Sequence, residues 1–552
     1  MKYPRSLFLR KTPPQQRKRF AGWAFYISFG GILCVSTLLF TFGHDDSLSE
    51  ASLSVFFNPS QSNNNDIDCP FRDSPIYKKV YVYPNHGDVA QGWSGEMLSE
   101  YGKDPQHPRW PFLDLDIQAR AAGTGHYNIL SQNVQYNTEL LVREIMIHPH
   151  SCLRTYDPEE ATLFYVPYLP SIEHHRGLDG FRDIDYSTSP YGQAIMDIVD
   201  KQDYTGWEQH FGLTSKYWKR REGADHILVF SEPMHGLYHP RSKRGNFHFI
   251  HSQKQLTPPI VISVELSKTF VDMYPQCAAK NILMPYPNTD GNWFNGKLEA
   301  EAWQLLHAQG NTTVSEILSS VALRAEQTFT TPRPIPQFYS AGNHGTCTKL
   351  RKAMKQDYEK CTRSFMTLSQ TLQVKNYALG MRLSTFCPCP GGDSPSAKRH
   401  YDALIAQCIP IILSYDFVWP FTNEFDSGIT LDPSVFALRL PAEEYDTPLL
   451  DPNTCQPVNE SRRGLQHYLE SISPAEIERL RQGAEMARKL YAWYEYDDKL
   501  VENPLREGVL PTGGAAHQLV KMLAERANGV RWPACREELK LPREPDATKF
   551  KC

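Results

Sequence analysis

The residues best suited to chemistry lie in one stretch between two predicted buried strands. STFCPCP (384–390) and IPIILS (409–414) are the strands, and GGDSPSAKRH (391–400) joins them as a glycine-led turn that enters a helix. A helix start after glycines presents free backbone N–H groups and the positive end of the helix dipole, which together bind anions. The pattern predicts a phosphate site, although an ordinary capped βα turn has the same residues.

Side chains in this turn add hydrogen-bond donors and positive charge. Ser394 is predicted to be the N-cap of the helix, with Pro395 at its first position. Asp393 belongs to the site or only caps the turn. The side chains that add donors or positive charge to the anion site are Ser394, Ser396, Lys398 and Arg399.

The elements that would position this turn are short apolar strands alternating with helices. Such strands predict parallel sheets covered by helices. TTPRPIP (330–336) is predicted to be a stiff linker, because three prolines in seven residues interrupt both regular structures. A second α/β unit follows, with a strand at 337–342, a helix capped by Thr346, and C-terminal helices at 475–494 and 517–527. Before the linker, a helix is predicted at 138–148, and strands at 79–84, 162–167, 226–231, 259–265 and 281–287.

The composition excludes several classes of protein. The 552 residues are 41% hydrophobic and 22% charged, which is enough apolar material for two or more cores and too much for a disordered chain. Lys and Arg number 58 against 62 Asp and Glu, and seven of the bases lie in the first twenty residues. The rest of the chain is therefore acidic, which argues against a nucleic-acid-binding body.

The N-terminal region predicts a membrane anchor. Residues 21–43 carry no charge and are long enough for one helix across a bilayer. The basic tail, 1–20, predicts a cytosolic N-terminus, so a type II signal anchor is favoured over a cleaved signal peptide. The Asn/Ser-rich residues 44–68 are expected to form a flexible stem. Beyond it the chain would face the lumen, where Asn311 and Asn459 are open to glycosylation.

The twelve cysteines indicate a disulfide-bonded chain in that compartment. Cys387 and Cys389 are predicted to be buried or disulfide-bonded rather than zinc ligands, because no second pair stands at ligand spacing. Cys347 and Cys361 would lie at opposite ends of one helix and are too far apart to pair. Eleven cysteines follow the membrane segment, so at least one stays unpaired or pairs between chains.

A resemblance to a known family rests on these same residues. MRLSTFCPCPGGDSPSAKRHYDALIAQCIPIILSYDFVWPF (381–421) closely resembles the signature of exostosin-type glycosyltransferases, with its Gly-Asp-Ser-Pro, basic helix start and Asp-Ala pair. Three earlier segments resemble the family in the same order: LRTYDPEEATLFYVPYLPS (153–171), GADHILVFS (223–231) and FYSAGNHG (338–345). The resemblance covers about residues 75–525.

The resemblance implies an α/β fold with two Rossmann-like domains, the GT-B-type glycosyltransferase architecture, after one N-terminal transmembrane helix. An N-terminal domain (69–330) would hold the acceptor and a C-terminal domain (331–552) the UDP-sugar, with a terminal helix packed back across the boundary. It further implies inverting chemistry without an obligate metal, so the UDP-sugar is a co-substrate and there is no cofactor. Members of the family are Golgi membrane proteins with a luminal catalytic domain.

Donor contacts follow from this resemblance. Asp402 is comparable to the acidic residue that other two-domain glycosyltransferases place on the ribose hydroxyls; alternatively it is a solvated carboxylate. Gly342 and Asn343 end a strand where ligand could approach the backbone, or form a simple turn. Arg382 is a candidate contact to diphosphate or uracil, or a surface charge. The diphosphate itself is assigned to Gly392, Ser394, Ser396 and Arg399, with Asp393 beside them.

Two positions depart from the family pattern. Gly391 stands where a basic residue is common, so one charge near the diphosphate is lost, and Lys398 and Arg399 are expected to compensate for it. Gln407 replaces a usual glycine before the strand at 409–414, which is expected to alter packing more than chemistry.

The general base is expected from the N-terminal domain. Glu232 and His235 follow the strand at 226–231, at the carboxyl end where α/β sheets place ligand groups. Asp225 and His226 precede that strand and are predicted to be structural. Glu173, His174 and His175 follow another strand and compete on the same argument, whereas the Asp-x-Asp matches at 114–116 and 183–185 follow no convincing buried strand.

The leading hypothesis is therefore a Golgi glycosyltransferase, hexosyl or glycuronosyl, that acts on a polysaccharide or glycan acceptor, alone or in a complex with other glycosyltransferases. One alternative is a non-catalytic luminal partner that stabilises an active enzyme. Another is a lectin-like module that binds glycan without a nucleotide.

Overall fold

The computed structural model describes a set of segments within one compact unit, Asp66–Cys552. The predicted tail, membrane segment, stem and long insertion at 85–130 lie outside these segments. Within the described residues, no helix is both long and apolar enough to cross a bilayer. The described residues are 69–83, 138–148, 151–169, 194–195, 197–198, 202–211, 215–231, 259–287, 333, 335–339, 347–361, 381, 384–392, 394–426, 429–440, 451, 453–454, 456, 464–493, 513–528 and 537.

The first half of the unit contains a six-stranded sheet in which every pairing is parallel. Its strands are buried on both faces, which is why the sequence shows continuous apolar runs instead of alternation. The five strands predicted before the linker are confirmed. In sheet order the strands are β2 (Arg154–Thr155), β1 (Val80–Val82), β3 (Leu163–Tyr165), β4 (His226–Phe230), β5 (Ile260–Ser263) and β6 (Ile282–Leu283).

Five described helices accompany this sheet. α4 contacts β1 and β4, and its predicted start at Thr138 is confirmed. Ser267 caps α10, accepting a hydrogen bond from the Phe270 N–H, and the proline at the start of α11 fits the first helical turn. Their bounds are α4 (Thr138–Ile147), α7 (Thr205–Phe211), α8 (Lys216–Arg220), α10 (Lys268–Met273) and α11 (Pro275–Lys280).

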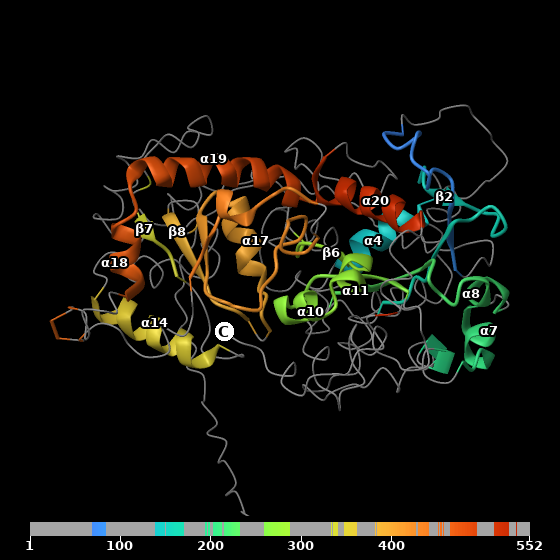
Figure 1. The fold of residues 1–552 in the computed structure, drawn as a ribbon, viewed down its shortest axis with the longest axis horizontal. Coiled ribbons are helices and arrows are strands. Elements are labelled where there is room, and N and C mark those ends of the chain that lie inside the picture. The colour runs from blue at the N-terminus through green and yellow to red at the C-terminus, as the bar shows by residue number, and fades with distance from the viewer. Residues whose placement is uncertain are drawn as a thin grey trace, which may run out of the picture. The chain divides into compact units, whose positions relative to one another are not determined.

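The second half contains a four-stranded parallel sheet, drawn in yellow and orange in Figure 1. β8 and β9 confirm the strands predicted around the glycine-led turn. The prediction that 330–336 is only a linker is wrong at its end, because strand pairing begins at Ile335. Pro336 is tolerated there because β7 is an edge strand, where the missing N–H of a proline costs no hydrogen bond between strands. In sheet order the strands are β10 (Leu438–Arg439), β9 (Ile409–Ile412), β8 (Ser384–Cys389) and β7 (Ile335–Gln337).

α17 (Lys398–Ile405) packs on β8 and β9 and is covered by α19 (Pro474–Tyr491), as Figure 1 shows. Contact on two sides explains why every described residue from His400 to Cys408 is buried. α14 (Thr348–Cys361) begins two residues after Thr346, and its predicted apolar positions Cys347, Leu350 and Met354 are buried. α18 (Gly464–Glu470) precedes α19.

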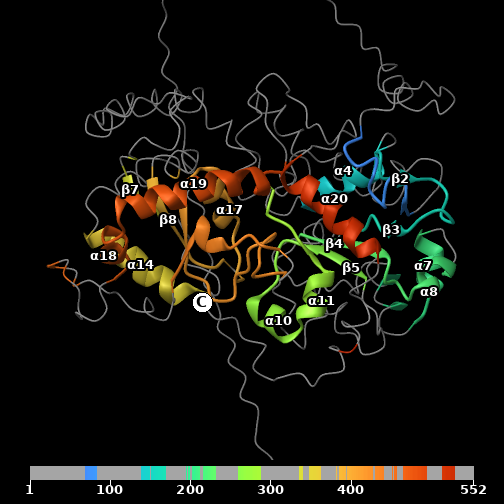
Figure 2. The ribbon, with the colours of Figure 1, turned by 45° about the horizontal axis from the view of Figure 1, so that its top comes forward.

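The last helix, α20 (Gly514–Ala527), returns to the first sheet, as the resemblance implied. It packs on the end of α19 and on β6 (Figure 2). Its Arg526 guanidinium donates to the carbonyl oxygens of Ala279 and Asn281, the latter at 3.0 Å. The Trp493 indole N–H donates to the carbonyl of Pro285 at 3.0 Å. The C-terminal segment thus ties the second half of the unit to the first.

Two disulfides have both of their cysteines among the described residues, and each joins segments of the same half; Cys277 and Cys347 are also disulfide-bonded. Cys69 pairs with Cys152 beside the first sheet, and Cys387 on β8 pairs with Cys408 before β9. Cys389 is free and buried, and burial raises the pKa of its thiol to about 12, so it stays protonated at neutral pH. The expectation that Cys387 and Cys389 are disulfide-bonded or buried is confirmed.

Candidate functional site

The loop between β8 and α17 needs both of its glycines. The Gly391 carbonyl accepts hydrogen bonds from the Arg351 guanidinium, including one from Nε at 3.0 Å. A Cβ on Gly391 would lie 3.0 Å from Cys347 Sγ and from the Ser394 carbonyl oxygen. On Gly392 it would lie 2.8 Å from the Ser396 carbonyl oxygen, which accepts the Gly392 N–H. The chain therefore folds tightly on itself only because these positions lack side chains.

The helix start differs from the prediction. α17 begins at Lys398 with Ala397 as its N-cap, so Ser394 and Pro395 precede the helix by a full turn. The Ala397 N–H donates to Nδ1 of His400 at 3.0 Å, a capping bond supplied from inside the helix. The predicted N-cap at Ser394 is wrong, because the hydroxyl of Ser394 is engaged elsewhere.

That partner is Glu265, which follows β5 in the first sheet. Its Oε2 accepts the Ser394 hydroxyl at 2.6 Å and the Ser396 backbone N–H at 2.5 Å. The Tyr286 hydroxyl, beyond β6, shares a further hydrogen bond with the Ser396 hydroxyl at 3.1 Å. Glu265, Ser394 and Ser396 are buried. Since β5 and β8 run parallel within their sheets, these contacts bring together the carboxyl ends of the two sheets.

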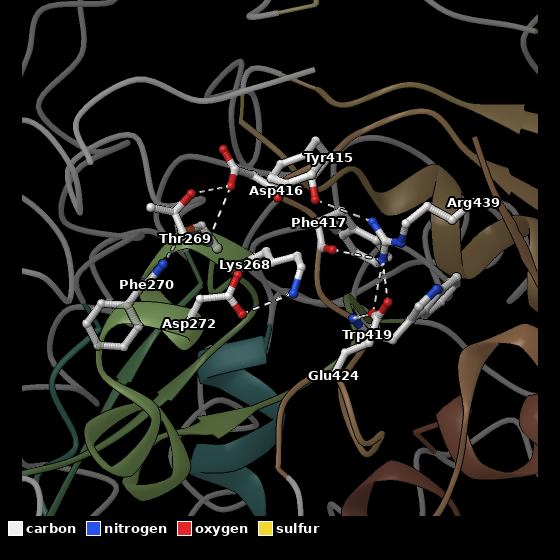
Figure 3. A network of polar contacts seen from close by, with 11 residues as sticks. Lys268, Thr269, Phe270, Asp272, Tyr415, Asp416, Phe417, Trp419, Glu424 and Arg439 are labelled. Carbon is white, nitrogen blue, oxygen red and sulfur yellow. Dashed lines mark hydrogen bonds and ion pairs between the residues drawn. The ribbon is translucent and has the colours of Figure 1, made fainter. Parts of the chain in front are cut away.

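A second contact joins the sheets beside the loop. The Thr269 hydroxyl on α10 donates to the Asp416 carboxylate at 2.6 Å, and the Lys268 N–H donates to the Asp416 carbonyl at 2.9 Å (Figure 3). Asp416 lies beyond β9, where the Arg439 guanidinium donates to the Phe417 carbonyl and to Glu424. This seam is built from the ends of β5 and β9, so it lies at the same edge of each sheet.

Positive charge gathers around the helix start. Burial lowers the pKa of His400 to about 3, and the guanidinium groups of Arg399, Arg439 and Arg351 act in the same direction. Burial also raises the pKa of Tyr339, after β7, while Arg399 and Arg351 oppose that rise. The arginines therefore concentrate positive potential at the carboxyl ends of β7, β8 and β9. Such a potential attracts an anion.

Lys398 adds no net charge to this potential. Its ammonium donates to the Asp402 carboxylate one turn along α17, and both groups are buried. Burial raises the pKa of Asp402 to about 6, although the charge of Lys398 opposes the rise. Burial also lowers the pKa of Lys398, and the charge of Asp402 opposes that fall. The interpretation of Asp402 as a solvated carboxylate is wrong, because the helix is covered on two sides. The Arg351 guanidinium, which donates to the Gly391 carbonyl, places a positive charge where the family resemblance implied a basic residue.

Three buried side chains here have hydrogen-bonding atoms without a partner among the described residues. They are Nε2 of His400, the hydroxyl of Tyr401, and the hydroxyl of Ser414, which follows β9. A Cβ on Gly391 would meet that hydroxyl at 3.2 Å, so Ser414 borders the glycine turn. The phenyl ring of Phe417 stacks on the His400 ring at 4.2 Å between centroids. Unsatisfied buried donors are costly, which is typical of groups that bind a ligand.

Asp225 and His226 lie at the opposite, amino edge of the first sheet. His226 Nδ1 bonds to Asp225 at 2.8 Å, Arg220 donates to the same carboxylate at 2.9 Å, and His226 Nε2 bonds to the Tyr83 hydroxyl at 3.0 Å. Aromatic rings enclose the imidazole, which packs against Trp218 at 4.5 Å. The prediction that this pair is structural is confirmed by its complete burial and internal pairing.

The remaining predicted residues lie outside the described residues, so their roles stay predictions. In the described part of the chain, no three His, Cys, Asp or Glu side chains gather as a metal site would require. The residues in question are Glu232 and His235 for catalysis, Gly342, Asn343, Arg382 and Asp393 for the donor, and Asn311 and Asn459 for glycosylation.

Sequence reasoning missed Glu265 and Arg351. Glu265 ends the strand-like run PIVISVE, so it lies at the carboxyl end of its strand. The same position after β4 is the reason why Glu232 is a candidate base. Arg351 comes four residues after Cys347, so it shares the buried face of α14. Both signals were present in the spacing of the chain.

The chain belongs to the exostosin family: the profile of the Exostosin GT47 domain matches residues 77–446. Its relatives include a probable glucuronosyltransferase of Oryza sativa subsp. japonica, 25% identical, covering 59% of this chain and 65% of the relative. Another is the probable arabinosyltransferase ARAD1 of Arabidopsis thaliana, 24% identical, covering 50% and 49%. A probable beta-1,4-xylosyltransferase of Arabidopsis thaliana, IRX10L, is 22% identical, covering 58% and 64%. The matches span about half to two thirds of these relatives.

Proposed function

We propose that the protein is a glycosyltransferase that moves a sugar from a UDP-sugar to a polysaccharide or glycan acceptor. One observation carries the proposal: the carboxyl ends of two parallel sheets meet at a glycine loop surrounded by arginines. Ligands of open α/β sheets bind beyond the carboxyl ends of the strands, and a basic loop there suits a diphosphate. The names of the relatives, which are a glucuronosyltransferase, an arabinosyltransferase and a xylosyltransferase, favour a glycuronosyl or pentosyl donor.

In the proposed reaction, an acceptor hydroxyl attacks the anomeric carbon of the donor and the nucleoside diphosphate leaves. The charge that develops on the diphosphate would be stabilised by Arg399, with Arg351 behind the loop, and by the start of α17. Because these groups supply the positive charge, we propose a metal-independent reaction with no cofactor. We also propose that the reaction is inverting, as the family resemblance implies. Inversion requires a single displacement, with the nucleophile on the face opposite to the leaving group.

We also propose which residues contact the rest of the donor and which residue takes the proton from the acceptor. We assign the ribose to Asp402, and the loop contacts to Gly392, Ser394 and Ser396. A base from the first sheet, Glu232 or His235, would receive the proton from the acceptor hydroxyl. The two sheets would then act as the acceptor and donor domains of a GT-B-type fold, with boundaries at 69–330 and 331–552.

The cellular setting follows from the N-terminal sequence. We propose a single-pass type II protein of the Golgi membrane, anchored by residues 21–43, with residues 69–552 in the lumen. The disulfides Cys69–Cys152 and Cys387–Cys408 suit an oxidising lumen. There the protein would act on its acceptor alone or in a complex with other glycosyltransferases.

A second candidate, a non-catalytic partner of another glycosyltransferase, is favoured by one observation. The Ser394 and Ser396 donors of the loop are already bonded to Glu265.

A panel of UDP-sugars incubated with the purified protein separates the two candidates. We expect one donor to be hydrolysed slowly to UDP, and UDP to raise the melting temperature of the protein. If no UDP-sugar is turned over while UDP still stabilises the protein, the partner role is supported. If UDP has no effect on the melting temperature, the donor site itself is wrong.

A further inference from the structure

A carboxylate of the protein lies where the leaving group of the donor is expected. The Glu265 side chain reaches from the end of β5 to the loop between β8 and α17, and one of its oxygens accepts both the Ser394 hydroxyl and the Ser396 N–H. These are the same hydroxyl and amide groups that the sequence assigns to the diphosphate. Glu265 is only 2% exposed, so little solvent screens its charge.

Carboxylate and phosphate oxygens compete for the same donors. The Ser394 hydroxyl and the Ser396 amide each carry one proton, so neither can make a full hydrogen bond to Glu265 and to a diphosphate together. A carboxylate beside a diphosphate also repels it, and at a buried position this repulsion is strong. The Ser394 hydroxyl and the Ser396 amide therefore bond to Glu265 in the structure and would bond to the diphosphate in the proposed donor complex.

We propose, resting on the function above, that Glu265 is a further residue of the donor site: its carboxylate occupies the loop while no nucleotide is bound, and the diphosphate displaces it. Glu265 then sets the affinity for the donor. After the exchange, Ser394 and Ser396 hold a phosphate oxygen, and the carboxylate of Glu265 turns away from the loop.

The surrounding contacts allow this exchange to stay local. Thr269 and Asp416 join the same two sheet edges through a hydrogen bond of their own (Figure 3). Trp493 and Arg526 tie the C-terminal segment to residues 279–285. The two halves therefore remain connected when Glu265 releases Ser394 and Ser396.

The alternative role for Glu265 is purely structural, tying the loop to the first sheet. Glu265→Gln separates the two roles, because the amide oxygen can still accept both hydrogen bonds while the negative charge is gone. A structural tie predicts unchanged anion binding in this variant. A competing anion predicts tighter binding.

The experiment measures binding of inorganic pyrophosphate and of UDP to the purified full-length protein by calorimetry. We expect Glu265→Gln to tighten the binding of both ligands by about tenfold, since a like charge is removed from the site. The matched control, Thr269→Val, breaks the neighbouring contact between the sheets and should leave both affinities within about twofold of wild type. Should Glu265→Gln fold poorly, Glu265→Asp shortens the reach of the carboxylate and should tighten binding to a smaller extent.

The two ligands distinguish failure of this inference from failure of the proposed function. If wild type binds UDP and neither Glu265 variant tightens either ligand, the function stands and the exchange is overturned. If Glu265→Gln tightens pyrophosphate but no variant binds UDP, the exchange is supported and the nucleotide-sugar function is wrong. Equal tightening by Thr269→Val would show that loosening of the seam, and not the charge of Glu265, is responsible, which overturns the inference.

Discussion

Two buried clusters of charged and polar groups lie at opposite edges of parallel sheets. At the amino end of β4, Asp225, His226, Arg220 and Tyr83 bond to one another inside a cage of aromatic rings. At the carboxyl ends of β8 and β9, the loop beside α17 is bonded to Glu265 from another sheet, and atoms of His400 and Ser414 have no hydrogen-bond partner among the described residues. Strand direction distinguishes the two clusters: the structural cluster lies at the amino end of a strand, whereas the proposed donor site lies at the carboxyl ends, where open α/β sheets bind ligands.

The largest effect is expected from Asp225→Asn, which removes the charge that pairs with Arg220 and His226. Bonds to these two residues overcome the effect of burial and hold the pKa of Asp225 below its usual value. Breaking a buried pair leaves an uncompensated charge, so we expect the free energy of unfolding to fall by about 3 kcal/mol. Urea unfolding measures this change.

The matched control is Asp272→Asn, which breaks an exposed ion pair with Lys268 at the first sheet. We expect it to change the free energy of unfolding by less than about 0.5 kcal/mol. If Asp225→Asn proves equally mild, the cluster at the amino edge is not the structural unit inferred here.

The next effect is expected at the carboxyl edge. Arg399→Ala should weaken UDP binding by about 10- to 100-fold, the usual range for a lost hydrogen bond to a charged group, with little effect on stability. Isothermal calorimetry measures the affinity. Arg479→Ala, on the exposed face of α19 where the arginine pairs with Glu476, is the control and should bind UDP as wild type does. Unchanged affinity in Arg399→Ala would remove this residue from the donor site.

The two histidines predict different sensitivity to acid. Burial lowers the pKa of both, but Asp225 opposes the shift at His226, whereas His400 has no carboxylate partner among the described contacts and its pKa falls to about 3. Between this value and the unfolded value near 6.5, the unfolded chain binds a proton that the folded chain does not, so the folded state is destabilised as the pH falls.

His400→Gln removes this dependence. Between pH 7 and pH 5 the wild type should lose about 2 kcal/mol more of its free energy of unfolding than the variant does. His226→Gln should show a smaller difference of the same sign. Urea midpoints at the two pH values measure both, and identical pH profiles for wild type and His400→Gln would contradict the assignment of a neutral buried imidazole.

The smallest effect concerns the glycine that departs from the family pattern. Gly391→Ser should destabilise the protein by about 1 kcal/mol, because its Cβ would press on Cys347 and on the Ser394 carbonyl. Gly513→Ser, at the cap of α20 where nothing lies within 4 Å, is the matched control and should be neutral. Thermal unfolding compares them. A neutral Gly391→Ser would mean that the loop has room for the basic side chain that the family resemblance implies at this position.

Much of the fold could be predicted because its signals are local. The runs around β1, β4, β5, β8 and β9 are apolar on both faces and short, which predicts buried parallel strands. Element boundaries depend on tertiary context: the proline-rich run at 330–336 predicts only a linker, yet the edge position of β7 tolerates Pro336. The helix after the loop was predicted one turn early, because Ser394 has the chemistry of a cap but uses it on Glu265.

Gln407 stands where the family resemblance implies a glycine, and the backbone conformation shows why glycine would suit this position. It follows α17 with a φ of 59°, in the left-handed region that favours glycine. Its amide donates to Glu485 on α19 at 3.2 Å, a contact that glycine could not make. The expectation that this substitution affects packing more than chemistry agrees with that contact.

The sequence by itself determined the alternation of strands and helices, the positions of the glycines and basic residues of the loop, and the membership in the exostosin family through motifs that are contiguous in the chain. The tertiary structure decided which groups meet that loop. Ser394 and Glu265 are 129 residues apart, and Arg351 reaches Gly391 from 40 residues away. Periodicity and capping are properties of neighbouring residues, whereas contacts at such separations arise only when two sheets pack with their carboxyl ends together.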